Sequence, residues 1–116
     1  MSRVANINIK NDLQSSDIAL FELESKIKDC QLEGIRVLKV VHGYGSSGKG
    51  GIIRNNVRQL LKVLQKKGEI VAFIPGELWI PSKINEYDLE DIPELYVDSE
   101  RTTLNSGATV IIISKK

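Results

Sequence analysis

The chain has 116 residues, enough for one domain with a real hydrophobic core but too few for two. Its formal net charge is +1, and its single cysteine, Cys30, excludes a disulfide framework and a zinc cluster. No signal-peptide pattern and no apolar run near the ~20 residues of a membrane span are found, so we expect a cytoplasmic domain with no membrane partner.

The charges are unevenly distributed along the chain. Residues 1–68 hold twelve Lys/Arg against six Asp/Glu, a local net charge of +6, whereas residues 69–116 hold four against nine, a net of −5. A basic half of this kind favours a polyanionic partner such as nucleic acid.

The first strand and helix are predicted from their hydrophobic periods. Val4–Ile9 largely alternates apolar and polar residues, which is typical of a strand. A helix then begins near Ser15 or Ser16, which can cap it, and stops at Gly34. Four residues at helical spacing predict its buried face: Leu20, Leu23, Ile27 and Cys30.

A second strand–helix–strand run follows. Ile35–Val41 predicts a strand, Gly51–Gly68 an amphipathic helix, and Glu69–Ile74 a third strand that Pro75 and Gly76 stop. The apolar face of this helix is formed by Ile53, Val57, Leu60, Leu61 and Leu64. A neighbouring stripe is basic at every fourth residue: Arg54, Arg58, Lys62 and Lys66.

The stretch Glu77–Ser106, called the insert below, has no clean period. It is rich in acidic residues, and Leu95–Val97 is a candidate short strand within it. The almost wholly apolar Ala108–Ile113 predicts a central final strand. The element order predicts an α/β two-layer sandwich in one domain, 1–116, with a four-stranded mixed sheet (βαβαββ order) and two helices on one face. Residues 77–106 form an acidic insert or long loop within it.

The segment from His42 to Gly51 carries the strongest functional pattern. It joins the second strand to the basic helix and is rich in glycine, which lets a backbone approach a ligand closely. The exposed N–H groups and positive dipole end of the following helix suit a phosphate. The predicted phosphate-binding residues are Gly43, Tyr44, Gly45, Ser46, Gly48, Lys49, Gly50, Arg54 and Arg58.

Two nucleotide-binding patterns fit this segment only in part. Gly43-x-Gly45-x-x-Gly48 matches the dinucleotide fingerprint, but it follows the second strand, and the chain is too short for the second half of such a fold. The same segment lacks the P-loop hydroxyl that would hold Mg²⁺, because Gly50 follows Lys49. The phosphate in question is therefore better sought in a nucleic-acid backbone.

Few side chains suit catalysis. His42 is the only histidine, and Ser46 and Ser47 have no separate histidine base, which argues against a hydrolase triad. At the end of a strand and facing a glycine-rich loop, His42 is either a packed histidine or the acid–base residue of a nuclease.

The chain resembles the small MutS-related (Smr) domain family. The resemblance rests on Val41-His42-Gly43-Tyr44-Gly45, on Ile53-Arg54 at the start of a helix, and on Ser106-Gly107-Ala108-Thr109-Val110 at the last strand. It implies an α/β fold and a domain that binds or nicks structured nucleic acid. Where the family carries Asp-Leu-His-Gly or Asp-Leu-Arg-Gly, an element tied to cleavage, this chain carries Asn8-Ile9-Lys10-Asn11.

The hypothesis that follows is a domain that binds structured RNA or branched DNA through backbone phosphates and needs no cofactor. Lys10 would add positive charge to the loop residues, and Tyr44 could stack on an exposed base. Two alternatives stay open. One is an Smr-type endonuclease with His42 as its catalytic residue, for which a divalent metal is an option. The other is a protein–protein adaptor that docks through Trp79 and Tyr87 of an exposed insert. A variant joins this alternative to the binding hypothesis: the acidic insert folds over the basic face as an anionic lid, and its deletion should tighten nucleic-acid binding.

Overall fold

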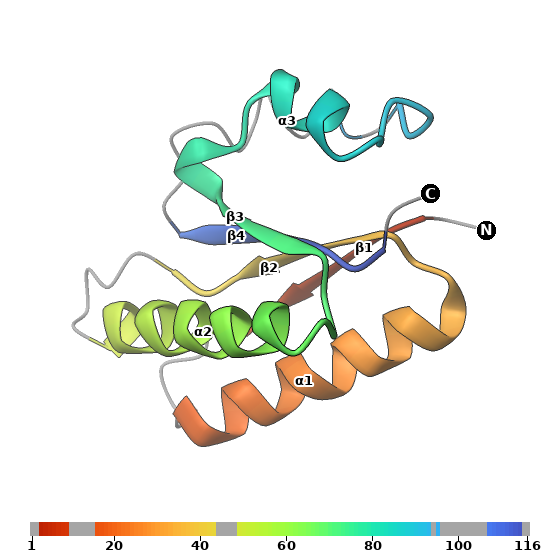
Figure 1. The fold of residues 1–116 in the computed structure, drawn as a ribbon. Coiled ribbons are helices and arrows are strands. Elements are labelled where there is room, and N and C mark those ends of the chain that lie inside the picture. The colour runs from red at the N-terminus through yellow and green to blue at the C-terminus, as the bar shows by residue number, and fades with distance from the viewer. Residues whose placement is uncertain (1–2, 10–15, 44–48, 94, 96–106, 115–116) are drawn as a thin grey trace.

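The computed structural model describes residues 3–9, 16–43, 49–93, 95 and 107–114, without the side chains of residues 16 and 49–51. The described elements run in the order β1 (Val4–Asn8), α1 (Ser16–Glu33), β2 (Val37–Val41), α2 (Lys49–Lys66), β3 (Ala72–Pro75), η1 (Gly76–Leu78), α3 (Pro81–Glu86) and β4 (Ala108–Ile112). Figure 1 shows a sheet with α1 and α2 on one side and the η1–α3 region on the other.

The four strands form one mixed sheet in the order β1-β2-β4-β3. β1 and β2 are parallel, and β4 runs antiparallel to both of its neighbours, so that Val37 of β2 lies opposite Val4 on one side and Ile112 on the other. The predicted fold class is confirmed, as is the central place of the last strand. Because a central strand is covered on both faces, every residue of β4 is buried.

One face of the sheet is covered by α1 and α2. The buried positions of α1 are Ala19, Leu23, Ile27 and Cys30, and those of α2 are Ile53, Val57, Leu61 and Leu64. These side chains join Leu38, Val40 and Ile111 of the sheet in one core cluster. Cys30 is thus a core residue, and its burial raises the pKa of its thiol. None of the helices in the described part of the chain is both long and apolar enough to cross a membrane.

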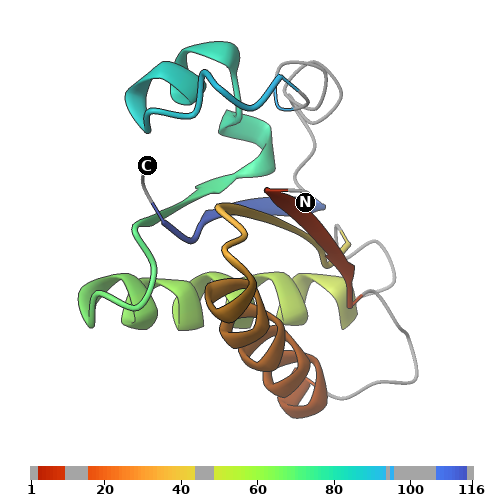
Figure 2. The same ribbon diagram turned by 90° about the vertical axis from the view of Figure 1, so that its right-hand side faces the viewer.

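The opposite face is covered by the insert (Figure 2). Its apolar side chains pack on the strand residues that alternate with those of the first cluster, such as Val110 and Ile112. The buried residues of this second cluster that the insert supplies are Trp79, Ile84, Leu89, Ile92 and Leu95.

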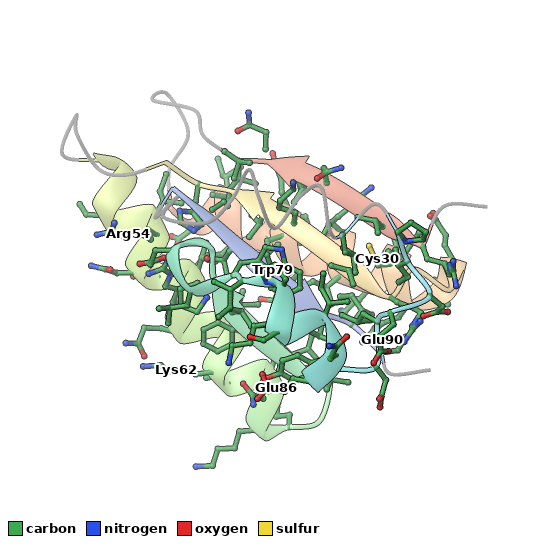
Figure 3. The ribbon with its side chains drawn as sticks, turned by 90° about the horizontal axis from the view of Figure 1, so that it is seen from above. Cys30, Arg54, Lys62, Trp79, Glu86 and Glu90 are labelled. Carbon is green, nitrogen blue, oxygen red and sulfur yellow. The ribbon has the colours of Figure 1, made fainter. Side chains whose placement is uncertain are left out.

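This arrangement corrects two expectations. Trp79 is only 1% exposed and lies over the sheet, so it is no docking residue on the surface (Figure 3). The described part of the insert also lies mainly on the face away from α2 and does not cover the basic helix, which it meets through the contact of Glu77 with Arg58. The proposed strand Leu95–Val97 falls mainly outside the described residues.

A charged cluster fastens the insert at the edge of the sheet where β1 and β2 begin. The guanidinium of Arg36 donates to Asp91 Oδ1 at 2.9 Å and to the Asp88 carbonyl at 2.8 Å. Arg3 donates to Asp91 Oδ2 and to the Asp91 carbonyl, each at 2.6 Å. The hydrogen bond from Arg36, aided by the charge of Arg3, lowers the pKa of Asp91.

Candidate nucleic-acid interface

The opposite edge of the sheet brings together the end of β2, the start of β4 and the start of α2. The backbone N–H groups of His42 and Gly43 both donate to the carbonyl of Gly107, each at 2.9 Å. Gly43 has a φ of 88°, in the left-handed region that residues with a Cβ rarely adopt. The turn that ends β2 is therefore tied to β4 and requires this glycine.

The His42 side chain is fully buried beneath this turn. Its Nδ1 lies 3.0 Å from the Gly43 carbonyl, and its Nε2 lies 2.8 Å from Thr109 Oγ1. Since a carbonyl only accepts, the neutral ring carries its proton on Nδ1, and the Thr109 hydroxyl donates to Nε2. Burial, reinforced by the charges of Arg58 and Arg54, lowers the pKa of His42 to about 4 against the hydrogen bond to Gly43. At neutral pH both ring nitrogens are thus engaged inside the protein.

Arg58 of α2 connects this buried network to the surface. Its Nε–H donates to Thr109 Oγ1 at 3.3 Å, which leaves the hydroxyl hydrogen of Thr109 for His42. Its two terminal nitrogens meet the carboxylate of Glu77 in η1 at 2.9 and 3.4 Å. A chain of donors therefore runs in one direction, from Arg58 through Thr109 and His42 to the Gly43 carbonyl.

Arg54 lies one turn nearer the start of α2 than Arg58. Its Nε is buried without a hydrogen-bond partner, a state shared within the described part of the chain only by Arg36 Nε. Arg54 and Lys62 point to the same side of α2 (Figure 3), and the first turn of α2 holds no acidic residue. Two residues of the basic stripe predicted from the sequence therefore share one side of α2, and Arg54 lies at its His42 end.

The structure brings together only part of the predicted site. His42, Gly43, Arg54 and Arg58 meet at this edge, and Lys49 and Gly50 lie in the first turn of α2 rather than in a loop. The remaining predicted residues lie outside the described ones: Lys10, Tyr44, Gly45, Ser46 and Gly48. Within the described residues, no group of three or more His, Cys, Asp or Glu side chains is placed to hold a metal ion.

Two residues of this network were not predicted from the sequence. Thr109 is the one polar residue in the apolar run Ala108–Ile113, and that break in the pattern marks it. Glu77 directly follows the Pro75-Gly76 stop, at the edge where β3 also ends. Nothing in the sequence pairs either of them with Arg58, because the contacts join residues that are far apart in the chain.

Comparisons with known proteins point to one family. The model of the Smr domain matches residues 13–77. The crystal structure of the Smr domain of Thermus thermophilus MutS2 superposes with a TM-score of 0.60 at 15% sequence identity, covering 95% of this chain and 98% of that one. At this identity the likeness concerns the fold alone. A search among curated proteins gave no significant match.

Proposed function

The chain belongs to the Smr domain family, and we propose that it binds structured RNA or branched DNA through backbone phosphates at the edge where β2 ends and α2 begins. Smr domains are in general nucleic-acid-binding, endonuclease-like domains. The finer assignment, to a binder whose contacts are mainly phosphate contacts, comes from the charges at this edge.

The observation that carries the proposal is the position of Arg54 and Arg58. Both lie within the first three turns of α2, directly after the glycine-rich segment, and both are partly buried. An arginine held by packing loses less side-chain entropy when it binds a phosphate than a freely moving lysine does.

The geometry supports binding better than cleavage. A general acid or base must reach the substrate with a free nitrogen, whereas each ring nitrogen of His42 already has a partner inside the protein. A neutral ring with a pKa of about 4 is also poorly matched to proton transfer near pH 7. We therefore assign His42 the role of holding the turn at Gly43 and the start of β4 in register.

Recognition of this kind depends on the shape of the nucleic acid more than on its sequence. Phosphate contacts fix register and orientation but do not distinguish bases. Tyr44 and Lys49 fall in the same glycine-rich segment of the sequence, where an aromatic ring can stack on an unpaired base and a lysine can neutralise a phosphate. We expect a preference for loops, branches and ends over uniform duplex.

The test is the salt dependence of binding. Labelled stem-loop RNA and a branched DNA are titrated with the wild-type protein, with Lys49→Ala/Arg54→Ala, and with a charge-matched control, Lys28→Ala/Lys67→Ala. The two control lysines lie on α1 and beyond the end of α2, away from the His42 edge. We expect the log–log salt slope to fall by about two in the first variant, roughly one for each lost phosphate contact, and to change little in the control.

Each outcome has a defined meaning. Equal slopes for the two double variants would remove the site from the start of α2, and no binding of either probe at low salt would reject the function itself. The same samples, run on a denaturing gel beside His42→Ala, test the endonuclease alternative. Cleavage that both His42→Ala and His42→Gln abolish, while both variants still bind the probes as the wild type does, would overturn the purely structural role of His42.

A further inference from the structure

The basic stripe on α2 has an acidic neighbour, and it comes from the insert. Glu77 Oε1 and Oε2 face the two terminal nitrogens of Arg58 at 2.9 and 3.4 Å. This two-point geometry is the one in which a guanidinium also binds a phosphate. Both terminal nitrogens of Arg58 are therefore already engaged by a carboxylate.

The contact is not needed to hold the insert in place. Trp79, Ile84 and Ile92 are buried against the sheet, and Asp91 fastens the insert to Arg36 and Arg3 at the opposite edge of the sheet. The Glu77 side chain is 34% exposed and meets one arginine, whereas Asp91 meets two. Glu77 can leave Arg58 without exposing apolar surface.

Arg58 also keeps partners without Glu77. Its Nε–H donates to Thr109 Oγ1 at 3.3 Å, and one terminal nitrogen lies 3.5 Å from the Ala108 carbonyl. These contacts fix the plane of the guanidinium from behind, while its outer side faces Glu77. The arginine is thus held ready for an anion whether or not the anion is Glu77.

The charge on Glu77 is maintained at neutral pH. Burial raises the pKa of its carboxyl, but this effect is outweighed by hydrogen bonds from its own backbone and from Arg58, and by the charges of Arg58 and Arg54, so that the pKa is lowered overall. A permanent negative charge beside Arg58 weakens the local field that attracts a phosphate.

We propose that Glu77 is an internal competitor for nucleic-acid phosphate, which occupies Arg58 in the free protein and is displaced when a phosphate binds. The inference rests on the proposed function, since it concerns the same basic stripe. It identifies the insert as the segment that sets the affinity of the site, through one carboxylate rather than through its overall acidity. On binding, a phosphate replaces the Glu77 carboxylate at the guanidinium of Arg58, which stays in place.

The experiment removes the negative charge of Glu77 and keeps the shape of its side chain. Glu77→Gln is compared with the wild type and with Glu86→Gln, which removes an equal charge from α3, where Glu86 pairs with Lys83 at 3.0 Å and not with Arg58. Binding to the labelled stem-loop RNA is measured over a range of salt. We expect Glu77→Gln to bind about tenfold more tightly near 0.1 M salt, within the range of a charged hydrogen bond, with a log–log slope steeper by about one.

Two further variants make the result specific. When Arg58 is replaced by glutamine, adding Glu77→Gln should no longer tighten binding. Glu77→Ala removes any hydrogen bond that the glutamine of Glu77→Gln could keep to Arg58, and it should tighten binding at least as much. An equal gain for Glu86→Gln, or a gain that persists without Arg58, would overturn the proposal in favour of a general charge effect. If Glu77→Gln changes nothing while Lys49→Ala/Arg54→Ala lowers the slope, the competitor role is wrong and the binding site stands. If the protein binds but neither variant changes binding, the site does not lie at the start of α2, and the competitor role falls with it.

Discussion

The two edges of the sheet each join the insert to the rest of the fold through an arginine and a carboxylate, but in different surroundings. At one edge Arg36, with a side chain 9% exposed, donates to Asp91 and to the Asp88 carbonyl, and both of these partners belong to the insert. At the other edge Arg58 divides its donors between buried Thr109 and half-exposed Glu77. The first arginine faces inward, and the second has one side turned to the surface.

This difference separates structure from function in two clusters of similar composition. Asp91 and Glu77 are about equally exposed, but Asp91 receives two arginines, and one of them, Arg36, is almost buried. Releasing Asp91 would leave the buried guanidinium of Arg36 without its charged partner, so this contact holds the insert in place. A carboxylate that meets one arginine at the surface is exchangeable, because water or another anion can replace it. The arginine of the second cluster also begins the chain of donors that ends at buried His42, and the predictions below test whether the two clusters do differ in this way.

The largest expected effect concerns the pH dependence of stability and tests whether His42 is held neutral. Because the pKa of His42 is about 4 in the folded protein and near 6.5 when unfolded, the unfolded chain binds a proton between these values that the folded protein does not. The free energy of unfolding should therefore fall as the pH is lowered from about 6.5 to 4, by about 3 kcal/mol in total from this one group.

The measurement is urea unfolding at several pH values for the wild type and His42→Gln. The glutamine amide can still accept from Thr109 but does not titrate, so the variant should be less stable at pH 8 and lose less stability on acidification. Carboxylates such as Glu77 and Asp91 contribute acid sensitivity of their own, which is common to both proteins and cancels in the difference. Parallel pH profiles would show that His42 is not held neutral by its burial.

The next effect should appear at the other edge of the sheet. Arg36→Met retains the aliphatic length of the side chain but removes both contacts to the insert, and we expect the urea midpoint to fall by about 1 M, the order expected when charge-assisted hydrogen bonds are lost from a domain of this size. Binding of the stem-loop RNA should stay within about twofold of the wild type. Arg58→Met should behave in the opposite way, with a smaller change in stability and a clear loss of affinity. Equal losses of affinity would erase the distinction between the two edges.

The fold was largely predictable from the sequence because the hydrophobic periodicity of each helix and strand is a local pattern. Leu23, Ile27 and Val57 lie on helix faces that 3.6-residue spacing identifies, and Gly34 ends α1 as a glycine with a φ of 74° should. The second apolar layer was not predicted. Its signal was present in the almost wholly apolar β4, since such a strand needs cover on both faces, but Trp79 and Ile84 follow no period that would assign them to that cover.

The sequence predicted which segment holds the site but not the contacts of its side chains. The position of His42 and Gly43 before a basic helix follows from sequence order, and so does the stripe that starts with Arg54. The state of His42 does not, because its pKa depends on Thr109 and Arg58, which are 67 and 16 positions away in the sequence and meet it only through the sheet and the crossover to α2. The exchange of partners proposed for Arg58 depends likewise on Glu77, whose charge in the sequence is one of many in an acidic stretch.

The smallest expected effect tests how far the binding surface extends from the His42 edge. Lys62 lies on the same side of α2 as Arg54 but two turns further along the helix, and it is exposed and more mobile than a packed arginine. Lys62→Gln should weaken binding of the stem-loop RNA by about twofold and lower the log–log salt slope by less than one, because a charge beyond the first contacts acts through a screened field. Its stability should match the wild type, as is usual for exposed substitutions. A loss as large as that of Arg58→Met would mean that the nucleic acid lies along the whole of α2, and the edge at His42 would then be one end of the interface rather than its centre.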